Sequence, residues 1–281
     1  MADLQELVAA ALTEDLGAGD VTSEATIPAE ARGRARIVQK QPGVVYGLEV
    51  VAEVMRQCGV TDVDNLVVEG QWRDAVPAEV LFASGPATAL LAAERTALNF
   101  LGHLSGVATL TARYVEAIAG TGAVIIDTRK TTPGLRELEK AAVLAGGGRN
   151  HRMGLYDAIL IKENHIALAG SLAKAVHAAR SEHPDLAVEV ETRNLDEVAY
   201  ALGTGADILL LDNMDLVTLR GAVRLRDENA GPGKGPSLEA SGGVNLETVR
   251  SIAETGVDLV SVGALTHSAP TLDFSMLIEL A

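Results

Sequence analysis

The stretch AVEVETRNLDEVAYALGTGADILLLDN, residues 187–213, carries the pattern that decides the fold. It opens with a short apolar run at 187–190, continues with a helical pattern at 195–202 and closes with a second apolar run at 207–211. Short, continuous apolar strands separated by a helix are typical of a parallel sheet that is buried on both faces. The stretch therefore predicts a strand–helix–strand unit of an α/β protein.

The same alternation extends over the chain from residue 112 onward. Its short apolar runs are predicted as strands at 123–126, 158–161, 187–190, 207–211, 237–238 and 259–261. Helical patterns separate or follow them at 134–144, 171–181, 195–202, 216–226 and 246–254. Six such units are fewer than the eight of a complete α/β barrel, so an incomplete barrel competes with an open, doubly wound sheet.

The first 111 residues follow a different rhythm, in which strands come in runs and helices are segregated. We predict strands at 35–39, 43–46, 66–68 and 79–83, and helices at 3–14, 48–58, 87–101 and 105–119. Segregated strands and helices suggest a separate α+β unit. We therefore expect an N-terminal domain over residues 1–111 and an α/β domain that begins at residue 112.

The composition excludes several classes of protein. The chain has 281 residues, and 38 acidic against 23 basic side chains give a formal net charge of −15, which repels nucleic-acid phosphates. The single cysteine, Cys58, rules out an internal disulfide framework and fits a reducing compartment. No uncharged stretch is apolar enough for a membrane span, and residues 1–12 do not form a secretory signal. We expect a cytoplasmic protein that binds neither nucleic acid nor membrane.

Charge is sorted along the α/β half of the chain. Between Asp127 and His165 there are seven Lys or Arg and five Asp or Glu, so this stretch carries +2 while the rest carries −17. Cations gathered where parallel strands end repel one another unless their ligand is a polyanion, such as a carboxylate or phosphate compound. The candidate ligand-binding residues are Arg129, Lys130, His151, Arg152 and Lys162. We place Arg136, Lys140 and Arg149 on the solvated surface instead.

Two carboxylates, Glu191 and Asp212, end successive predicted strands and should point towards the same space. Mg²⁺ usually takes one or two protein carboxylates together with oxygens of a phosphorylated ligand, so the pair is a candidate metal site. The alternative is that each carboxylate simply forms an ion pair with Lys162 or another cation.

Glycines follow the last two predicted strands, in Ser241-Gly242-Gly243 and at Gly263. Glycine lets backbone N–H groups approach a phosphate, and barrels often hold phosphate in the loops after their last strands. A third glycine run, 146–148, precedes His151 and Arg152. It either frees the chain to place those two side chains over the mouth of the barrel or only ends a helix.

Six motifs together resemble the quinolinate phosphoribosyltransferase family over essentially the whole chain. They are DTRKTTPGLR (127–136), GGGRNHRMG (146–154), IKENH (161–165), LLDNM (210–214), EASGG (239–243) and VGALTHS (262–268). The resemblance implies an incomplete α/β barrel of six or seven strands over 112–266 and an N-terminal α/β sandwich domain. It further implies that the tail, 267–281, packs back onto that first domain.

The resemblance also implies a reaction and a site. The family condenses quinolinate with phosphoribosyl pyrophosphate (PRPP) in the presence of Mg²⁺, giving nicotinate mononucleotide, pyrophosphate and CO₂ for NAD synthesis, and works as a homodimer. Residues that match the quinolinate pocket are Arg129, His151, Arg152, Lys162 and, supplied by the partner subunit, Arg95. Lys130 matches a lysine near the pyrophosphate, and Glu191 and Asp212 match the acidic pair for Mg²⁺ and ribose. The 5′-phosphate loops are matched by Ser241, Gly242, Gly243, Gly263 and His267.

These assignments predict how the substrate is held. Arg129 and Arg152 are expected to clamp the two carboxylates, while Lys162 and His151 hold the ring nitrogen facing C1 of the ribose. Three other functions compete with this one. A related protein linked to molybdenum transport shares the TRKT motif, a Schiff-base aldolase or sugar-phosphate isomerase would use Lys162 as its nucleophile, and a non-catalytic sensor would only bind a phosphorylated ligand.

Overall fold

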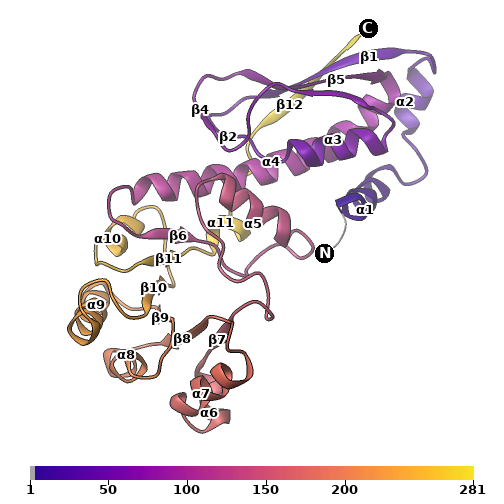
Figure 1. Ribbon diagram of the computed structural model, residues 1–281. Helices are drawn as coiled ribbons and strands as arrows, with labels where there is room; N and C mark the ends of the chain where they lie inside the picture. Colours follow the sequence, from indigo (N-terminus) through magenta and orange to yellow (C-terminus); the bar gives the residue numbers. More distant parts are fainter. Residues whose placement is uncertain (1–3) are drawn as a thin grey trace. The chain divides into compact units, whose positions relative to one another are not determined.

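The computed structural model describes residues 4–281 (Figure 1). The chain forms two compact units, each with its own sheet. Unit 1 comprises residues 1–112, 132–147 and 268–281, and unit 2 comprises 113–131 and 148–267. The division near residue 112 lies close to the predicted boundary, but 132–147, which we expected inside the α/β domain, groups with unit 1.

Unit 1 is built on a four-stranded antiparallel sheet in the order β12-β1-β5-β3. The strands are β1 Arg32–Gln39, β3 Asp62–Asn65, β5 Ala78–Pro86 and β12 Phe274–Leu280, and a small second sheet pairs β2 Gly43–Val44 with β4 Trp72–Arg73. The helices are α1 Leu4–Leu16, α2 Val21–Thr26, α3 Leu48–Gln57, α4 Ala87–Ala117, which runs on into unit 2, and α5 Arg136–Ala145. Helices α3 and α4 lie under one face of the larger sheet (Figure 1).

The last strand of the chain, β12, belongs to the first sheet. Its residues pair antiparallel with β1 from Gly33↔Leu280 to Gln39↔Phe274. The pairing covers an edge of β1 that would otherwise expose unpaired backbone groups. The C-terminal tail is therefore a strand of unit 1.

Helix α4 differs from the prediction, which gave two helices over 87–101 and 105–119. The structure has one continuous helix, Ala87–Ala117. Gly102 and Gly106 lie in the helix where it meets the C-terminal segment. The Leu272 N–H donates to the Gly102 carbonyl at 3.0 Å, and a Cβ at Gly106 would collide with the Pro270 carbonyl. The glycines thus permit close approach of a neighbouring backbone rather than ending the helix.

Two smaller predictions for unit 1 were also wrong. The strand expected at 66–68 lies earlier, at β3, and Leu66 and Val68 are exposed. Lys140, predicted on the surface, is fully buried in α5. The sequence of a short segment does not show which other parts of the fold will cover it. The burial of Lys140 could therefore not be read from the residues around it.

Unit 2 is built on a six-stranded sheet in which all neighbours are parallel, in the order β6-β11-β10-β9-β8-β7. The strands are β6 Val124–Ile126, β7 Ile159–Ile161, β8 Val188–Thr192, β9 Ile208–Asp212, β10 Ser237–Ser241 and β11 Leu259–Ser261. Within the described residues β6 and β7 do not pair, so the barrel is not closed, and a single parallel bridge between Ile126 and Arg149 extends the β6 edge. The predicted mixed α/β fold with an incomplete barrel is confirmed.

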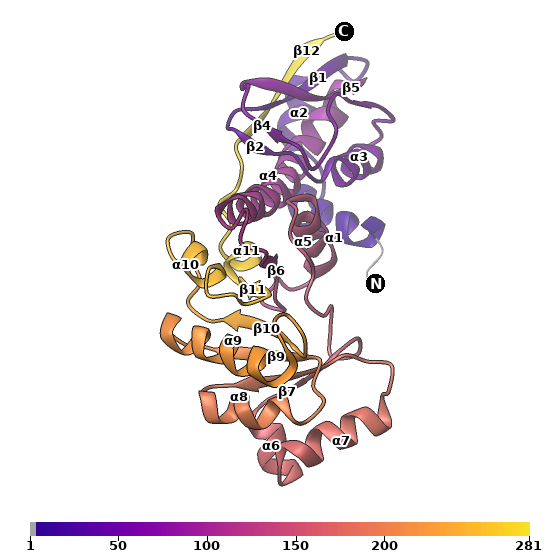
Figure 2. The same ribbon diagram turned by 60° about the vertical axis from the view of Figure 1, so that its left-hand side comes forward.

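Helices follow the strands of unit 2 and flank its sheet (Figure 2). They are α6 Glu163–Ala169, α7 Leu172–Glu182, α8 Leu195–Leu202, α9 Leu216–Ala230, α10 Val249–Ala253 and α11 Ala264–His267. Helix α6 was not predicted, because its first residues were read as part of the polar segment after β7. Nowhere along 4–281 does a helix combine the length and the apolar character that a membrane crossing needs.

Two aspartates tie neighbouring strands together at the amino ends of this sheet. Asp207, just before β9, accepts the Val188 N–H at 2.7 Å and pairs with Arg180. Asp258, just before β11, accepts the Leu238 N–H at 2.8 Å in the same way. Each carboxylate thus satisfies a donor at the start of the adjacent strand, which backbone pairing alone leaves open.

Candidate active site

The predicted site residues of unit 2 follow the carboxyl ends of its six strands. The parallel register places Glu191 opposite Leu210 and Ser241 opposite Asp212, so the Glu191, Asp212 and Ser241 side chains leave the same face of the sheet. Lys162 follows β7 on that face, and its Nζ lies 3.1 Å from Oε2 of Glu191. The ion-pair alternative for Glu191 is therefore present in the structure.

The two glycines after β10 have an unusual backbone conformation. Gly242 and Gly243 have φ of +100° and +62°, a region that other residues rarely adopt. A Cβ at Gly242 would collide with the side chain of Asn213, which itself has a φ of +53°. The Asn213 side chain, in the loop after β9, therefore packs against Gly242, in the loop after β10, where any larger residue would collide with it.

Lys130 and His267 both lie against Gly263. A Cβ at Gly263 would be 3.2 Å from Cδ of Lys130 and 3.1 Å from Nε2 of His267. The Thr266 hydroxyl donates to the Lys130 carbonyl at 2.9 Å and so joins the segment after β6 to helix α11. The predicted pyrophosphate lysine and one of the predicted phosphate loops are neighbours in unit 2.

His151 is held at all of its polar atoms. Its backbone N–H donates to Oδ1 of Asp127 at 2.9 Å, and its Nδ1 accepts the Arg152 N–H at 2.7 Å. Its Nε2 lies 2.9 Å from Oε2 of Glu189 and 3.5 Å from Oε2 of Glu239. Both ring nitrogens are therefore engaged within the protein, so neither can bind the quinolinate nitrogen, as we predicted for His151, without giving up a contact.

The two carboxylates also set the charge of the imidazole. Burial lowers the pKa of His151, but its contacts with Glu189 and Glu239 outweigh burial and raise that pKa to about 10. The Arg152 N–H opposes a second ring proton, because it occupies Nδ1. In both the neutral and the protonated imidazole, Nε2 carries a proton that points towards the two carboxylates.

Arg129 and Arg152 are close enough to affect each other. Burial and the positive charge of Arg129 lower the pKa of Arg152, while Glu189 and Asp157 act in the opposite direction. The Arg152 guanidinium also donates to the Ala158 carbonyl at 3.2 Å. Two half-buried guanidinium groups close to each other suit an anion with more than one negative charge.

Glu189 and Glu239 were missed by the sequence analysis, although both are buried. Each lies two residues before a predicted site residue, in the strands VEVET and SLEAS. A charged residue inside an otherwise apolar, buried strand is a signal of a specific partner, because an unpaired buried charge is costly. That signal was available in the sequence.

The run of three glycines ends a helix. Helix α5 stops at Ala145, Gly147 has a φ of +86°, and a Cβ at Gly146 would collide with the Ala108 carbonyl of α4. Arg149 then pairs with Ile126 at the edge of β6. The run therefore brings the chain back to the sheet, and His151 follows two residues later.

Arg95 is the exception among the predicted site residues. It lies on α4 in unit 1 and is exposed, whereas all the others belong to unit 2. Its assignment to a site shared between subunits stays a prediction.

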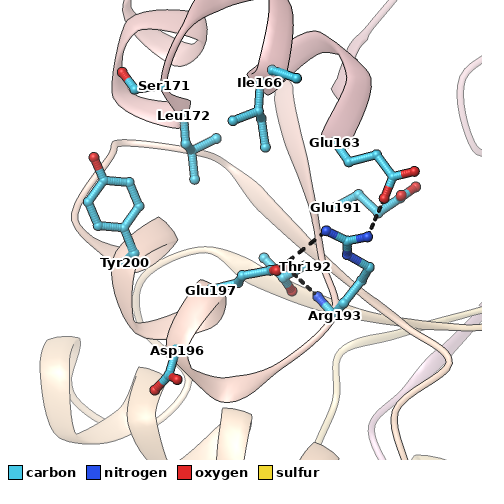
Figure 3. Close-up of a pocket in the computed structure, with 11 residues that line it drawn as sticks. Glu163, Ile166, Ser171, Leu172, Glu191, Thr192, Arg193, Asp196, Glu197 and Tyr200 are labelled. Atoms are coloured by element: carbon cyan, nitrogen blue, oxygen red, sulfur yellow. Dashed lines mark hydrogen bonds and ion pairs between the residues drawn. The ribbon is translucent and has the colours of Figure 1, made fainter.

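A cavity of about 580 Å³ lies beside Glu191, between α6, α7 and α8. Figure 3 shows the residues that line it. Its one cation, Arg193, is paired with Glu163 and Glu197. Its charged lining residues are Glu163, Glu191, Arg193, Asp196 and Glu197. A cavity with four carboxylates and one paired arginine repels a dianion, so the anionic substrate is not expected there.

Possible metal ligands form two sets. Glu191 and Asp212 offer carboxylate oxygens from one face of adjacent strands, a donor set that suits Mg²⁺ with substrate and water oxygens completing its shell. Among residues 4–281, the group of three His, Cys, Asp or Glu donors within 4.8 Å of one another is a different one, His151, Glu189 and Glu239. In this group the Nε2 proton of the imidazole occupies the place between the two carboxylates that a metal ion would take.

Comparison with known proteins gives a consistent answer. Residues 20–105 match the sequence model of the quinolinate phosphoribosyl transferase N-terminal domain, and residues 107–277 match that of the C-terminal domain. A nicotinate-nucleotide pyrophosphorylase [carboxylating] from Mycobacterium leprae is 42% identical over 97% of this chain and 96% of its own length. A probable enzyme of the same name from Synechocystis is 45% identical over 95% of this chain and 90% of its own length.

Solved structures that closely resemble this chain belong to the same family as the sequence relatives. The crystal structure of NadC from Streptococcus pyogenes has a TM-score of 0.91 and 39% identity, and the match covers 99% of this chain and 97% of that one. A nicotinate-nucleotide pyrophosphorylase from Francisella tularensis has a TM-score of 0.90 and 36% identity, over 98% and 96% of the two chains. The chain belongs to the quinolinate phosphoribosyltransferase family.

Proposed function

We propose that this chain transfers the phosphoribosyl group of PRPP to quinolinate, with loss of CO₂, and so makes nicotinate mononucleotide for NAD synthesis. The observation that carries the proposal is the pair of guanidinium groups, Arg129 and Arg152, at the carboxyl ends of a sheet with glycines in the loops after its last strands. Quinolinate is a pyridine with two adjacent carboxylates, which two guanidinium groups can bind side by side. The names of the relatives support the same reaction.

The bound quinolinate would be oriented by the same residues. With its carboxylates on Arg129 and Arg152, the ring nitrogen can face the ribose C1, and Lys162 is the candidate to assist it. Lys162 already pairs with Glu191 and is exposed, so it can turn to a ligand with little cost in desolvation. His151 contributes without contacting the substrate, because its Nδ1 accepts the Arg152 N–H and so holds the backbone of a substrate-binding arginine.

The activated sugar would occupy the other side of the mouth. Backbone N–H groups of Gly242, Gly243 and Gly263 suit the 5′-phosphate, with Ser241 and His267 beside them. Lys130, which lies against Gly263, would neutralise the leaving pyrophosphate. Glu191 and Asp212 would hold Mg²⁺ or the ribose hydroxyls, and the ion supplies positive charge for the pyrophosphate oxygens.

The chemistry balances without an organic cofactor. The electron pair of the ring nitrogen forms the bond to C1 as the bond from C1 to pyrophosphate breaks. The nitrogen is then positive and stabilises the carbanion left when the adjacent carboxylate departs as CO₂, after which a proton takes its place. The protein's part is orientation and charge stabilisation.

One assay separates this function from its competitors. Purified protein with quinolinate, PRPP and Mg²⁺ should release one CO₂ per nicotinate mononucleotide formed, and omission of PRPP should abolish the release. Trapping of substrate on Lys162 by borohydride would favour a Schiff-base enzyme instead. Binding of PRPP without turnover would favour a sensor, and molybdate binding would favour the transport-related protein.

We also propose that the active form is a homodimer in which Arg95 completes the partner's site. Its place on α4, outside the unit that holds every other site residue, supports this reading. Mixing inactive R95A with inactive K162A should restore activity, because a hybrid dimer has one site with both residues intact. Failure of the mixture to recover any activity would contradict a shared site. The lone Cys58 is compatible with a reducing, cytoplasmic location.

A further inference from the structure

Glu189 and Glu239 have no part in the function described so far. Both are buried in the sheet of unit 2, with 3% and 1% of their surface exposed. Glu189 lies on β8 and Glu239 on β10, and both share the face from which Glu191 and Ser241 project. A buried carboxylate is retained only where a partner compensates the loss of water.

The partner of both is the imidazole of His151. Nε2 faces Glu189 at 2.9 Å and Glu239 at 3.5 Å, while the other ring nitrogen receives the Arg152 N–H. The carboxylates therefore fix the ring in its plane, and the ring fixes the backbone at Arg152. A shift of the ring would move the guanidinium that is expected to bind the substrate.

The same carboxylates balance the cations beside them. Arg129 and Arg152 repel each other, and Glu189 acts against that repulsion at Arg152. Glu189 attracts the Arg152 guanidinium, while burial and the neighbouring Glu239 raise the pKa of Glu189 and so limit this compensation. Negative charge beside the two arginines reduces the repulsion between them while the site is empty. The same negative charge also weakens their attraction for a dianionic ligand.

We propose that Glu189 and Glu239 are positioning residues of the quinolinate pocket, which hold His151 and Arg152 in place and lower the positive charge that the substrate meets. The inference rests on the proposed function, because it assumes that quinolinate binds at Arg129 and Arg152. It assigns to two buried residues a role in the geometry and the affinity of the pocket.

The decisive experiment compares E189Q with E189A, and E239Q with E239A. Glutamine at position 189 can still accept the Nε2–H bond, and glutamine at position 239 keeps a polar side chain near Nε2, but neither carries a charge. Alanine removes the polar group as well as the charge. The glutamine variants should keep kcat within about threefold and bind quinolinate several-fold more tightly, because a repelling charge is gone. The alanine variants should lose about tenfold to a hundredfold in kcat, since Arg152 is no longer held.

The matched control is D258N, which breaks an ion pair with a buried arginine at the opposite, amino end of the same sheet. It should lower thermal stability and leave kcat and the quinolinate Kd of the folded protein unchanged. Kd is measured by calorimetry, which also counts binding sites, so loss of folded protein is separated from loss of turnover.

Each result has one meaning. If E189A and E239A keep the kcat of the unaltered chain, or if the glutamine variants bind quinolinate no more tightly, the positioning role is wrong while the proposed function stands. If the unaltered chain neither binds quinolinate nor releases CO₂ from it, the proposed function and this inference both fail.

Discussion

The two ends of the six-stranded sheet use charged residues in opposite ways. At the amino ends, Asp207 and Asp258 each accept one strand N–H and pair with one arginine, Arg180 or Arg226. At the carboxyl ends, Arg129 lies close enough to Arg152 for its positive charge, together with burial, to lower the pKa of the Arg152 guanidinium. Charges that pair within the chain stabilise the fold, whereas like charges gathered at one place are a site for an anion.

The amino-end device is visible twice in the sequence. GADILL, 205–210, and GVDLVS, 256–261, share a glycine two residues before the aspartate, and both glycines have positive φ. The glycine lets the chain turn from a helix into the next strand, and the aspartate then ties that strand to its neighbour. The side chains at the carboxyl ends are more varied, because Lys162 follows β7, Asp212 ends β9 and Ser241 ends β10.

The largest effect is expected at the carboxyl ends. R152A or R129A should leave a substrate carboxylate without its partner and cost about 2–5 kcal/mol in kcat/KM for quinolinate. R193A is the matched control, because Arg193 also follows a strand but pairs with Glu163 and Glu197. Steady-state kinetics check the contrast, which would break down if R193A were as damaging as R152A.

A second prediction, also at the carboxyl ends of the strands, distinguishes quinolinate binding from turnover. K130A should lower kcat by about a hundredfold to a thousandfold, because the leaving pyrophosphate loses a stabilising charge. Quinolinate affinity should stay the same, since Lys130 lies against Gly263, on the phosphate side of the mouth. K174A, an exposed lysine on α7, serves as the control. Loss of quinolinate binding in K130A, measured by calorimetry, would place Lys130 in the wrong half of the site.

The third effect belongs to the amino ends and concerns stability. D258N removes the charge that Arg226 faces, and Arg226 is 5% exposed whereas Asp258 is 40% exposed. We expect a loss of about 1–3 kcal/mol in the free energy of unfolding, which urea denaturation measures. The kcat of the folded protein should not change, and a lower kcat would mean that the two ends are not independent.

The smallest effect is a pH dependence at Asp207. Burial raises the pKa of this carboxyl, but Arg180 and the Val188 N–H outweigh burial and lower it. A lowered pKa means that the carboxylate stabilises the fold above its ordinary range near pH 4 and loses this effect as the pH falls through the lowered value.

D207N should therefore cost less than about 1 kcal/mol at pH 7, because both partners are more than a third exposed. The difference in unfolding free energy between D207N and the unaltered chain should shrink as the pH is lowered towards 3. A difference that grows on acidification would contradict the assigned sign.

Much of the site could be predicted because its signals are local. Lys162, Glu191 and Asp212 are read from the residues that follow each apolar run, and Gly242 and Gly243 from the turn they permit. The role given to Arg95 came from a family resemblance, and the Mg²⁺ site came from the paired carboxylates Glu191 and Asp212; both stay predictions. Glu189 and Glu239 were overlooked because periodicity assigns them to a strand and does not show what they face.

By itself, the sequence determined the order of strands and helices in the α/β half and the residues at the strand ends, because both depend on patterns a few residues long. Only the tertiary structure decided that α4 is one helix, since the Gly102 and Gly106 positions are explained by residues 270–272. It likewise decided which carboxylates meet His151, because strand register brings together side chains that lie far apart in the chain.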